Sequence, residues 1–173
     1  AFEPDSGYAD PHGMVNGFVD AARDRGAEAM PQTAARDIKL ANGSVTGVVT
    51  DEGEISTPVV VNAAGPWAGQ VGRWVGLDLP LEISREEDLV LRPPADAPPL
   101  RRAVSNMVDR TYFHPEADGS ILIGTGHPKE NQPADPDSYS RDADREFIED
   151  VTRRFVYRFP TMENATHVAT WAG

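Results

Sequence analysis

The sequence contains no cysteine, which excludes disulfide bonds, zinc sites built from thiolates and a cysteine nucleophile. It also has no run of about 18 apolar residues, the length at which a helix can span a membrane, so we expect no membrane span. Lysine is scarce, since Lys39 and Lys129 are the two present and the other basic residues are arginines. The first residues lack the basic and apolar regions of a signal peptide, and we therefore expect a cytoplasmic protein.

Acidic residues dominate the charge. Aspartate and glutamate number 28 against 16 lysines and arginines, which gives a net charge of −12 and argues against a nucleic-acid partner. The four histidines are far apart and have no metal-ligand spacing, so we expect no metal site. With 39% hydrophobic residues the chain can build a core of one domain or a domain and a half.

Residues 59–69 form the most informative stretch, in which three valines run into small residues, a glycine and a proline. The valines predict that 55–63 is a strand buried on both faces, as in a parallel sheet. Pro66 then suits the first turn of a helix. In α/β folds a strand end with bare backbone is where cofactors approach closely. A tight turn without a ligand is the alternative interpretation.

The first half of the chain predicts a compact α/β block. Asp10 and Pro11 are good residues to begin a helix, and Gly26 is a good residue to end it. Asn42-Gly43 predicts a hairpin turn. The strands expected here cover 27–30, 37–40 and 45–50.

The second half predicts antiparallel strands and one helix. Asp118-Gly119 predicts a hairpin turn, and Phe147, Ile148, Val151 and Phe155 recur at helical spacing. The strands expected here cover 79–91, 104–108, 111–114, 120–124 and 168–171. The charged residues 85–88 are interpreted as a solvated strand edge or loop.

No self-contained catalytic group emerges from the residues alone. Residues 124–129 resemble a dinucleotide fingerprint, but the third glycine is absent and Pro128 does not suit the required helix. No Gly-x-Ser-x-Gly elbow is present either. Tyr112, His114 and His127 are candidates to share one sheet face near a cleft.

Three segments together resemble the middle of FAD-dependent oxidoreductases of the D-amino-acid oxidase superfamily, in the branch of sarcosine oxidase, dimethylglycine dehydrogenase and glycine oxidase. Residues 7–13 (Gly-Tyr-Ala-Asp-Pro-His-Gly) resemble the family's entry to a helix, and 59–69 resemble its strand and turn. Residues 112–124 resemble its substrate-domain hairpin, and the closing 171–173 (Trp-Ala-Gly) resemble a further family segment.

The resemblance implies an α/β (α+β) fold in two parts. Residues 1–74 would be a partial FAD-binding, Rossmann-like domain, made of a helix, a β-meander, a buried strand and a helix. Residues 75–173 would be a truncated, antiparallel substrate-binding domain. We expect an excised central piece, because the family's Gly-x-Gly-x-x-Gly loop and its flavin-covering segment are not in this sequence.

The resemblance also implies site residues. Ala35 would offer backbone groups to the adenine of FAD, and Ala64, Gly65 and Trp67 would lie near the flavin and its diphosphate. Tyr112 would line the substrate cavity. A lysine that helps oxygen react in sarcosine oxidases is replaced here by Leu122, which favours a dehydrogenase slightly, although glycine-oxidase-like members also lack that lysine.

The function that the resemblance implies is oxidation of a secondary or tertiary amine or an amino acid by hydride transfer to flavin. Hydroxy acids, relatives of glycerol phosphate and D-amino acids remain open as substrates. We expect the isolated chain to be inactive, to retain no FAD, and to self-associate through exposed apolar seams. A non-catalytic binding or assembly module of the same fold is the alternative.

Overall fold

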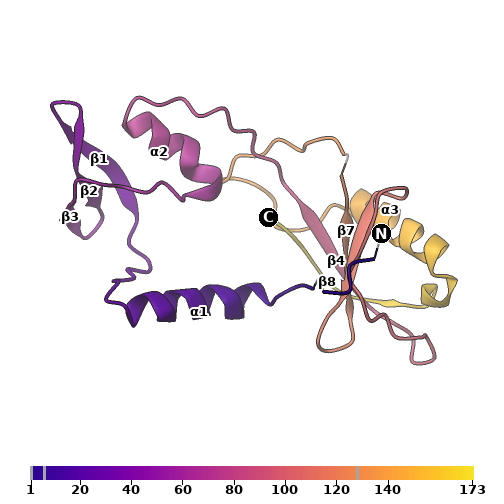
Figure 1. The fold of residues 1–173 in the computed structure, drawn as a ribbon. Coiled ribbons are helices and arrows are strands. Elements are labelled where there is room, and N and C mark those ends of the chain that lie inside the picture. The colour runs from indigo at the N-terminus through magenta and orange to yellow at the C-terminus, as the bar shows by residue number, and fades with distance from the viewer. Residues whose placement is uncertain (1, 6, 128) are drawn as a thin grey trace. The chain divides into compact units, whose positions relative to one another are not determined.

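The computed structural model describes residues 2–5, 7–127 and 129–173 (Figure 1). The chain divides into two compact units: one holds residues 9–82, and the other joins the first eight residues to 83–173. The boundary expected at 74/75 separates an FAD-binding part from a substrate-binding part. This division by role stays a prediction.

The helix expected after Asp10 is confirmed as α1 (Pro11–Arg23). The Asp10 carboxylate accepts a hydrogen bond from the backbone N–H of Gly13 at 2.7 Å, which satisfies one of the free donors of the first turn. Gly26 has a φ of +88°, the left-handed conformation that commonly follows the end of a helix.

A three-stranded antiparallel sheet follows in the same unit, with the order β1-β2-β3. Asn42 and Gly43 both have positive φ, as the expected two-residue hairpin turn requires. The strand expected at 27–30 is wrong, since these residues form no strand. The strands observed are β1 (Ala35–Ala41), β2 (Ser44–Thr50) and β3 (Gly53–Ser56).

The buried strand expected at 55–63 is also wrong. The strand β3 ends at Ser56, and Val59 and Val61 are 69% and 83% exposed. The physical reason is that a strand needs a hydrogen-bonded neighbour, and the described residues place no strand beside 57–63.

The helical pattern after the valine run is confirmed. A short 3₁₀ turn, η1 (Gly65–Trp67), leads directly into α2 (Ala68–Trp74). Pro66 lies within the first turn, where the missing N–H costs no hydrogen bond. The helix α2 packs beside β1.

The second unit contains a five-stranded antiparallel sheet with the order β5-β6-β7-β4-β8. The long strand expected at 79–91 is right only from Glu87, where β4 begins. Arg85 bonds elsewhere, since its N–H donates to the carbonyl of Gln132 at 2.9 Å, while Glu86 continues the pairing with the end of β8 by donating to the carbonyl of Gly173 at 2.7 Å. The strands are β4 (Glu87–Arg92), β5 (Val104–Asn106), β6 (Thr111–Pro115), β7 (Ile121–Thr125) and β8 (Thr166–Ala172).

The helix expected in the second half is confirmed as α3 (Arg145–Arg158), which packs on one face of this sheet. A second 3₁₀ turn, η2 (Pro160–Met162), follows it. None of the described helices is long and apolar enough to cross a membrane. The core between sheet and helix consists of Leu89, Leu91, Phe113, Ile121, Ile123, Val151, Phe155 and Met162.

Candidate functional site

Four residues form a row across the face of the sheet that α3 leaves uncovered. Tyr112 pairs in register with Gly124, Gly124 with Asp88, and Asp88 with Trp171. Side chains alternate between the faces of a strand. Since Leu89 and Phe113 point into the core beneath α3, their neighbours Asp88 and Tyr112 lie on the opposite face.

The Tyr112 hydroxyl donates a hydrogen bond to Asp88 Oδ1 at 2.6 Å. The ring reaches across β7 because Gly124 has no side chain, and a Cβ there would stand 2.2 Å from Tyr112 Cζ. The side chain of Trp171 also hydrogen-bonds to Asp88. Asp88 is therefore a half-buried carboxylate that accepts from two aromatic residues on opposite sides.

The electrostatics of the pair follow from this geometry. Burial raises the pKa of the Asp88 carboxyl, while the hydrogen bonds from Tyr112 and Trp171 partly offset that rise. Burial and the bond to Asp88 also raise the pKa of Tyr112. Tyr112 therefore keeps its proton at neutral pH, and that proton points at Asp88.

Charges and rings flank the row. Lys129 forms an ion pair with Glu86 and donates to the carbonyl of Thr125 at 3.3 Å. Tyr8 stacks on His114 with the ring centroids 4.6 Å apart, and its hydroxyl donates to the carbonyl of Pro115. Within the described residues, no group of three or more His, Cys, Asp and Glu side chains could hold a metal ion.

The interpretation of 85–88 as a solvated strand edge or loop is wrong for Arg85 and Glu87, although the side chain of Glu86 is 44% exposed. The side chains of Arg85 and Glu87 are 9% and 4% exposed, and they form an ion pair at 3.3 Å. Glu87 also accepts from the N–H of Asp144 at 2.5 Å, and Arg85 donates to the carbonyl of Ser140 at 2.9 Å. A run of charged residues in a sequence predicts a solvent-exposed segment. Here residues 130–144 fold over the run and bury Arg85 and Glu87, which the sequence does not indicate.

The residues expected near the cofactor all lie in the unit 9–82. Ala35 is the first residue of β1, and Ala64, Gly65 and Trp67 lie together at the turn into α2. Gly65 has a φ of +53°, and a Cβ built on it would meet nothing within 4 Å. Asn62 holds this turn, because its side chain accepts from Ala64 N–H at 3.3 Å and donates to the Ala68 carbonyl at 2.9 Å.

This turn fits the close approach of a flavin. Ala64 carries only a methyl group, Gly65 has no side chain, and the space around Gly65 is open. Trp67 is 41% exposed. The roles of these residues and of Ala35 toward FAD, and that of Tyr112 toward substrate, stay predictions.

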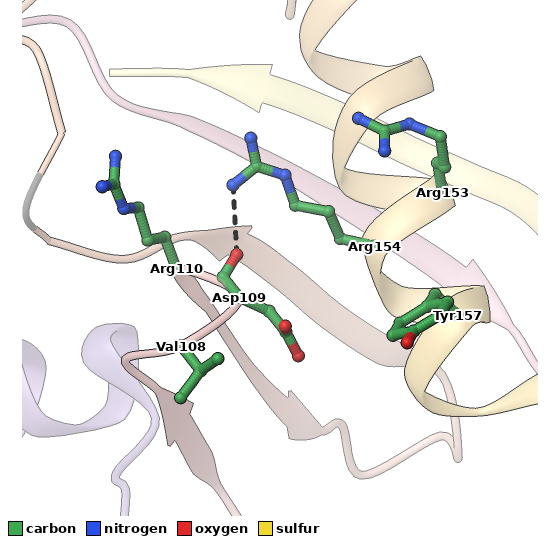
Figure 2. A pocket seen from close by; sticks show the side chains of 6 residues that line it. All are labelled: Val108, Asp109, Arg110, Arg153, Arg154 and Tyr157. Atoms are coloured by element: carbon green, nitrogen blue, oxygen red, sulfur yellow. Dashed lines mark hydrogen bonds between the residues drawn. The ribbon is translucent and has the colours of Figure 1, made fainter.

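A separate pocket of about 620 Å³ lies where the turn between β5 and β6 meets α3 (Figure 2). Arg154 donates to the carbonyl of Asp109 at 3.0 Å and pairs with Asp150 at 2.5 Å, and Arg153 also pairs with Asp150. Both guanidinium groups therefore already have partners: Arg154 braces the turn against the helix, whereas Arg153 pairs within α3. The pocket is lined by Val108, Asp109, Arg110, Arg153, Arg154 and Tyr157.

Sequence reasoning missed Asp88, Gly124 and Trp171 as members of the row with Tyr112. Strand alternation could have placed Asp88 on a face, but the register that joins four strands is a tertiary property. The expected sharing of one face holds for Tyr112 and His114, which lie two residues apart on β6. It is wrong for His127, which is exposed and lies beyond the end of β7.

Comparison with known proteins now gives the family. The sequence profile described as "DAO: FAD dependent oxidoreductase" matches residues 1–173. The chain belongs to this family. It is 30% identical to glycine oxidase from Pseudomonas putida over 131 residues. This aligned region covers 76% of this chain and 33% of that protein. It is 38% identical over 85 residues to mitochondrial sarcosine dehydrogenase from Mus musculus, which covers 46% of this chain and 9% of that protein.

Solved structures agree on the fold. L-proline dehydrogenase from P. horikoshii superposes with a TM-score of 0.84 at 26% identity, covering 95% of this chain and 43% of that chain. Glycine oxidase from Bacillus cereus superposes with a TM-score of 0.76 at 26% identity. The match covers 92% of this chain and 42% of that chain. The chain therefore spans less than half the length of these relatives, and its fold is part of a FAD-binding oxidase fold.

Proposed function

We propose that this chain is the central part of an FAD-dependent oxidoreductase that oxidises a small secondary or tertiary amine or amino acid. The observation that carries the proposal is the family match along all 173 residues. The names of the relatives narrow the substrate class, since they act on glycine, sarcosine, dimethylglycine and L-proline. All four are small amino acids, and three of them are secondary or tertiary amines.

The flavin, when bound, supplies the hydride acceptor. The turn at Ala64 and Gly65 leaves room for it, Trp67 lies beside that turn, and Ala35 offers its backbone to the adenine. Tyr112 lines the substrate cavity and helps to orient the C–H bond to be broken. The protein's contribution is thus binding, orientation and the exclusion of water.

Leu122 favours a dehydrogenase over an oxidase in this proposal. It lies on β7 opposite His114 and is half-buried. The resemblance gives sarcosine oxidases a lysine at this place that helps oxygen react, and because glycine-oxidase-like members also lack that lysine, the preference is slight. Oxygen uptake that is slow relative to reduction of an artificial electron acceptor supports this assignment. Rapid hydrogen peroxide production contradicts it.

The 173-residue segment by itself is proposed to bind FAD weakly and to show no turnover. It is also proposed to self-associate, because Phe18, Val59 and Val61 are 71%, 69% and 83% exposed. Flavin fluorescence and sedimentation of the segment test both statements. Its location in the cytoplasm stays a prediction.

The deciding experiment is anaerobic flavin reduction in the protein expressed from its complete coding sequence. Sarcosine, dimethylglycine, glycine and L-proline are added in turn, with D-alanine and glycolate representing two of the other open classes. Bleaching of the flavin band by the amines supports the proposal. Bound flavin that only glycolate reduces contradicts the amine class, and a protein that binds no flavin is the non-catalytic module.

A further inference from the structure

The pocket between the β5–β6 turn and α3 is basic, although the chain as a whole carries a net charge of −12. Its lining includes three arginines, Arg110, Arg153 and Arg154, against one carboxylate, Asp109. Figure 2 shows Arg110 on the side of the turn and the other two arginines on the side of the helix. Its volume of about 620 Å³ is typical of small-molecule pockets. A basic concavity on an acidic protein attracts anions.

The turn that forms one wall of this pocket is held by hydrogen bonds to its backbone. Asn106 Oδ1 accepts from the N–H of Asp109 at 3.2 Å, and Arg154 donates to the Asp109 carbonyl at 3.0 Å. Gly126 N–H donates to the Arg110 carbonyl at 2.8 Å. The wall therefore has its shape before a ligand binds, which lowers the entropic cost of binding.

Two side chains on this wall, in contrast, are not used by the fold. The Arg110 guanidinium is exposed and forms no hydrogen bond or ion pair within residues 2–5, 7–127 and 129–173. Arg110 also has a φ of +52°, which is unfavourable for a residue with a Cβ and often marks a functional position. Val108 is 84% exposed. An unpaired cation beside an exposed apolar side chain matches an anion that has an apolar body.

The carboxylate of Asp109 does not cancel this attraction. Asp109 Oδ2 accepts from Arg158 Nη2 and Nε at 2.6 and 3.0 Å, and from Asn106 at 2.5 Å. These bonds compensate its charge within the turn itself. The cation of Arg110 is therefore left for a ligand.

Arg153 can exchange its present partner for a ligand at little cost. Its side chain is 74% exposed, and its pair with Asp150 joins residues three apart on α3. Exposed pairs of this kind add little stability. Asp150 keeps Arg154, which pairs with it at 2.5 Å and remains the brace of the turn. Tyr157, one helical turn after Arg153, is 82% exposed and lines the same pocket.

We infer that this pocket is a binding site for a small organic oxyanion, a carboxylate or a phosphate ester, that carries an aromatic body. Arg110 and Arg153 bind the anionic group, since a guanidinium donates two parallel hydrogen bonds to such oxygens. Val108 and Tyr157 pack against the aromatic body. The inference does not depend on the proposed oxidation, because it uses none of the residues expected to contact flavin or amine.

Calorimetric titration of the protein expressed from its complete coding sequence tests the inference. Phenyl phosphate has both the charge and the ring, inorganic phosphate lacks the ring, and benzyl alcohol lacks the charge. We expect phenyl phosphate to bind more tightly than either. Phenylacetate, titrated in parallel, distinguishes a carboxylate ligand from a phosphate ester, and binding of either that depends on Arg110 supports the inference.

Variants locate the binding. Arg110→Asn removes the cation, and asparagine tolerates a positive φ. We expect the Kd for phenyl phosphate to rise about tenfold, because a hydrogen bond between charged groups is lost. Arg110→Lys keeps the charge without the planar fork and should recover part of the affinity. Tyr157→Ala should raise the Kd for phenyl phosphate about threefold and leave that for inorganic phosphate unchanged.

The matched control is Arg145→Gln, which removes the same charge from α3 at a side chain that is 91% exposed and does not line the pocket. It should leave every Kd unchanged. Equal losses of affinity in Arg110→Asn and Arg145→Gln overturn the inference, because they indicate a diffuse attraction in place of a site. It is also overturned if phenyl phosphate and phenylacetate bind no better than benzyl alcohol, or if neither Arg110→Asn nor Tyr157→Ala changes their Kd.

Discussion

The phenol ring of Tyr112 lies directly over Gly124, so closely that a Cβ on Gly124 would stand 2.2 Å from Cζ and 2.3 Å from Oη. The absence of one methyl group on β7 therefore decides whether a side chain from β6 can reach a carboxylate on β4. Glycine in a strand interior often marks such a close approach. Here the approach is made by a side chain of the same sheet.

Gly124→Ala should displace the Tyr112 ring and break its bond to Asp88. We expect the free energy of unfolding to fall by about 1–3 kcal/mol, the usual range for adding a methyl group to a filled position. Urea denaturation measures it. Gly126→Ala is the matched control, because a Cβ at Gly126 would meet its nearest atom at an ordinary 3.5 Å.

The same substitution in a Tyr112→Ala background should cost much less, since the atoms that the new methyl group displaces are then absent. A double-mutant cycle reports this coupling. An equal cost of Gly124→Ala in both backgrounds would show that the strain arises from the backbone and not from the ring.

Local signals in the sequence predicted much of this fold. The pair Asp10-Pro11 begins α1, Asn42-Gly43 turns β1 into β2, and the spacing of Phe147 to Phe155 gives the buried face of α3. Each of these signals is local, because it involves residues that are neighbours or one helical turn apart in the sequence. Its effect therefore does not require a contact with a distant part of the chain.

Other features depend on partners far along the chain, and they could not be predicted. The valine run at 59–61 has the composition of a strand but no neighbouring strand among the described residues. The strand predicted from β-propensity alone is therefore wrong. The burial of Arg85 and Glu87 requires a loop that follows about fifty residues later. The row of Tyr112, Asp88 and Trp171 requires the register of four strands.

Glu87→Ala should be among the most damaging single substitutions in the second unit. It removes the acceptor for Asp144 N–H and Gln132 Nε2, and it leaves the buried guanidinium of Arg85 with fewer carboxylates. Breaking a buried ion pair from one side typically costs about 3–5 kcal/mol. We expect a loss of that size in urea denaturation.

The matched control is Glu149→Ala, which breaks a pair with Arg145 whose side chains are 64% and 91% exposed. Exposed pairs four residues apart on a helix contribute about 0.3–0.5 kcal/mol. If the two substitutions cost the same, the network around Arg85 does not anchor the loop 130–144.

Phe155→Ala should cost about 3–5 kcal/mol, because it empties a large space in the core. Phe155 is 1% exposed, and its ring lies 5.3 Å from that of Phe113 and 5.1 Å from that of Phe159. Tyr157→Ala on the same helix is the control. Tyr157 is 82% exposed, so a change within about 0.5 kcal/mol is expected there. Thermal denaturation of both variants checks that α3 faces the sheet as described.

Asp118 should make the protein lose stability at low pH. Hydrogen bonds from the hydroxyl and N–H of Ser120, at 2.6 and 2.9 Å, and from Arg92 at 2.9 Å lower the pKa of its carboxyl from 3.8 to about 2. Because the folded-state pKa lies below the unfolded value, the stabilisation is complete above pH 3.8. It is lost as the pH falls through that value toward about 2.

Asp118→Asn should therefore lower stability at pH 7 and flatten the fall in stability between about pH 4 and pH 2. Ser120→Ala removes one of the donors and should produce part of the same flattening. Urea midpoints measured at intervals of half a pH unit give the slope for each protein. Because the slope is proportional to the difference in bound protons between the unfolded and folded states, a variant with the wild-type slope would mean that Asp118 titrates alike in both. The three donors at the Asp118-Gly119 turn would then not act on its carboxylate in solution.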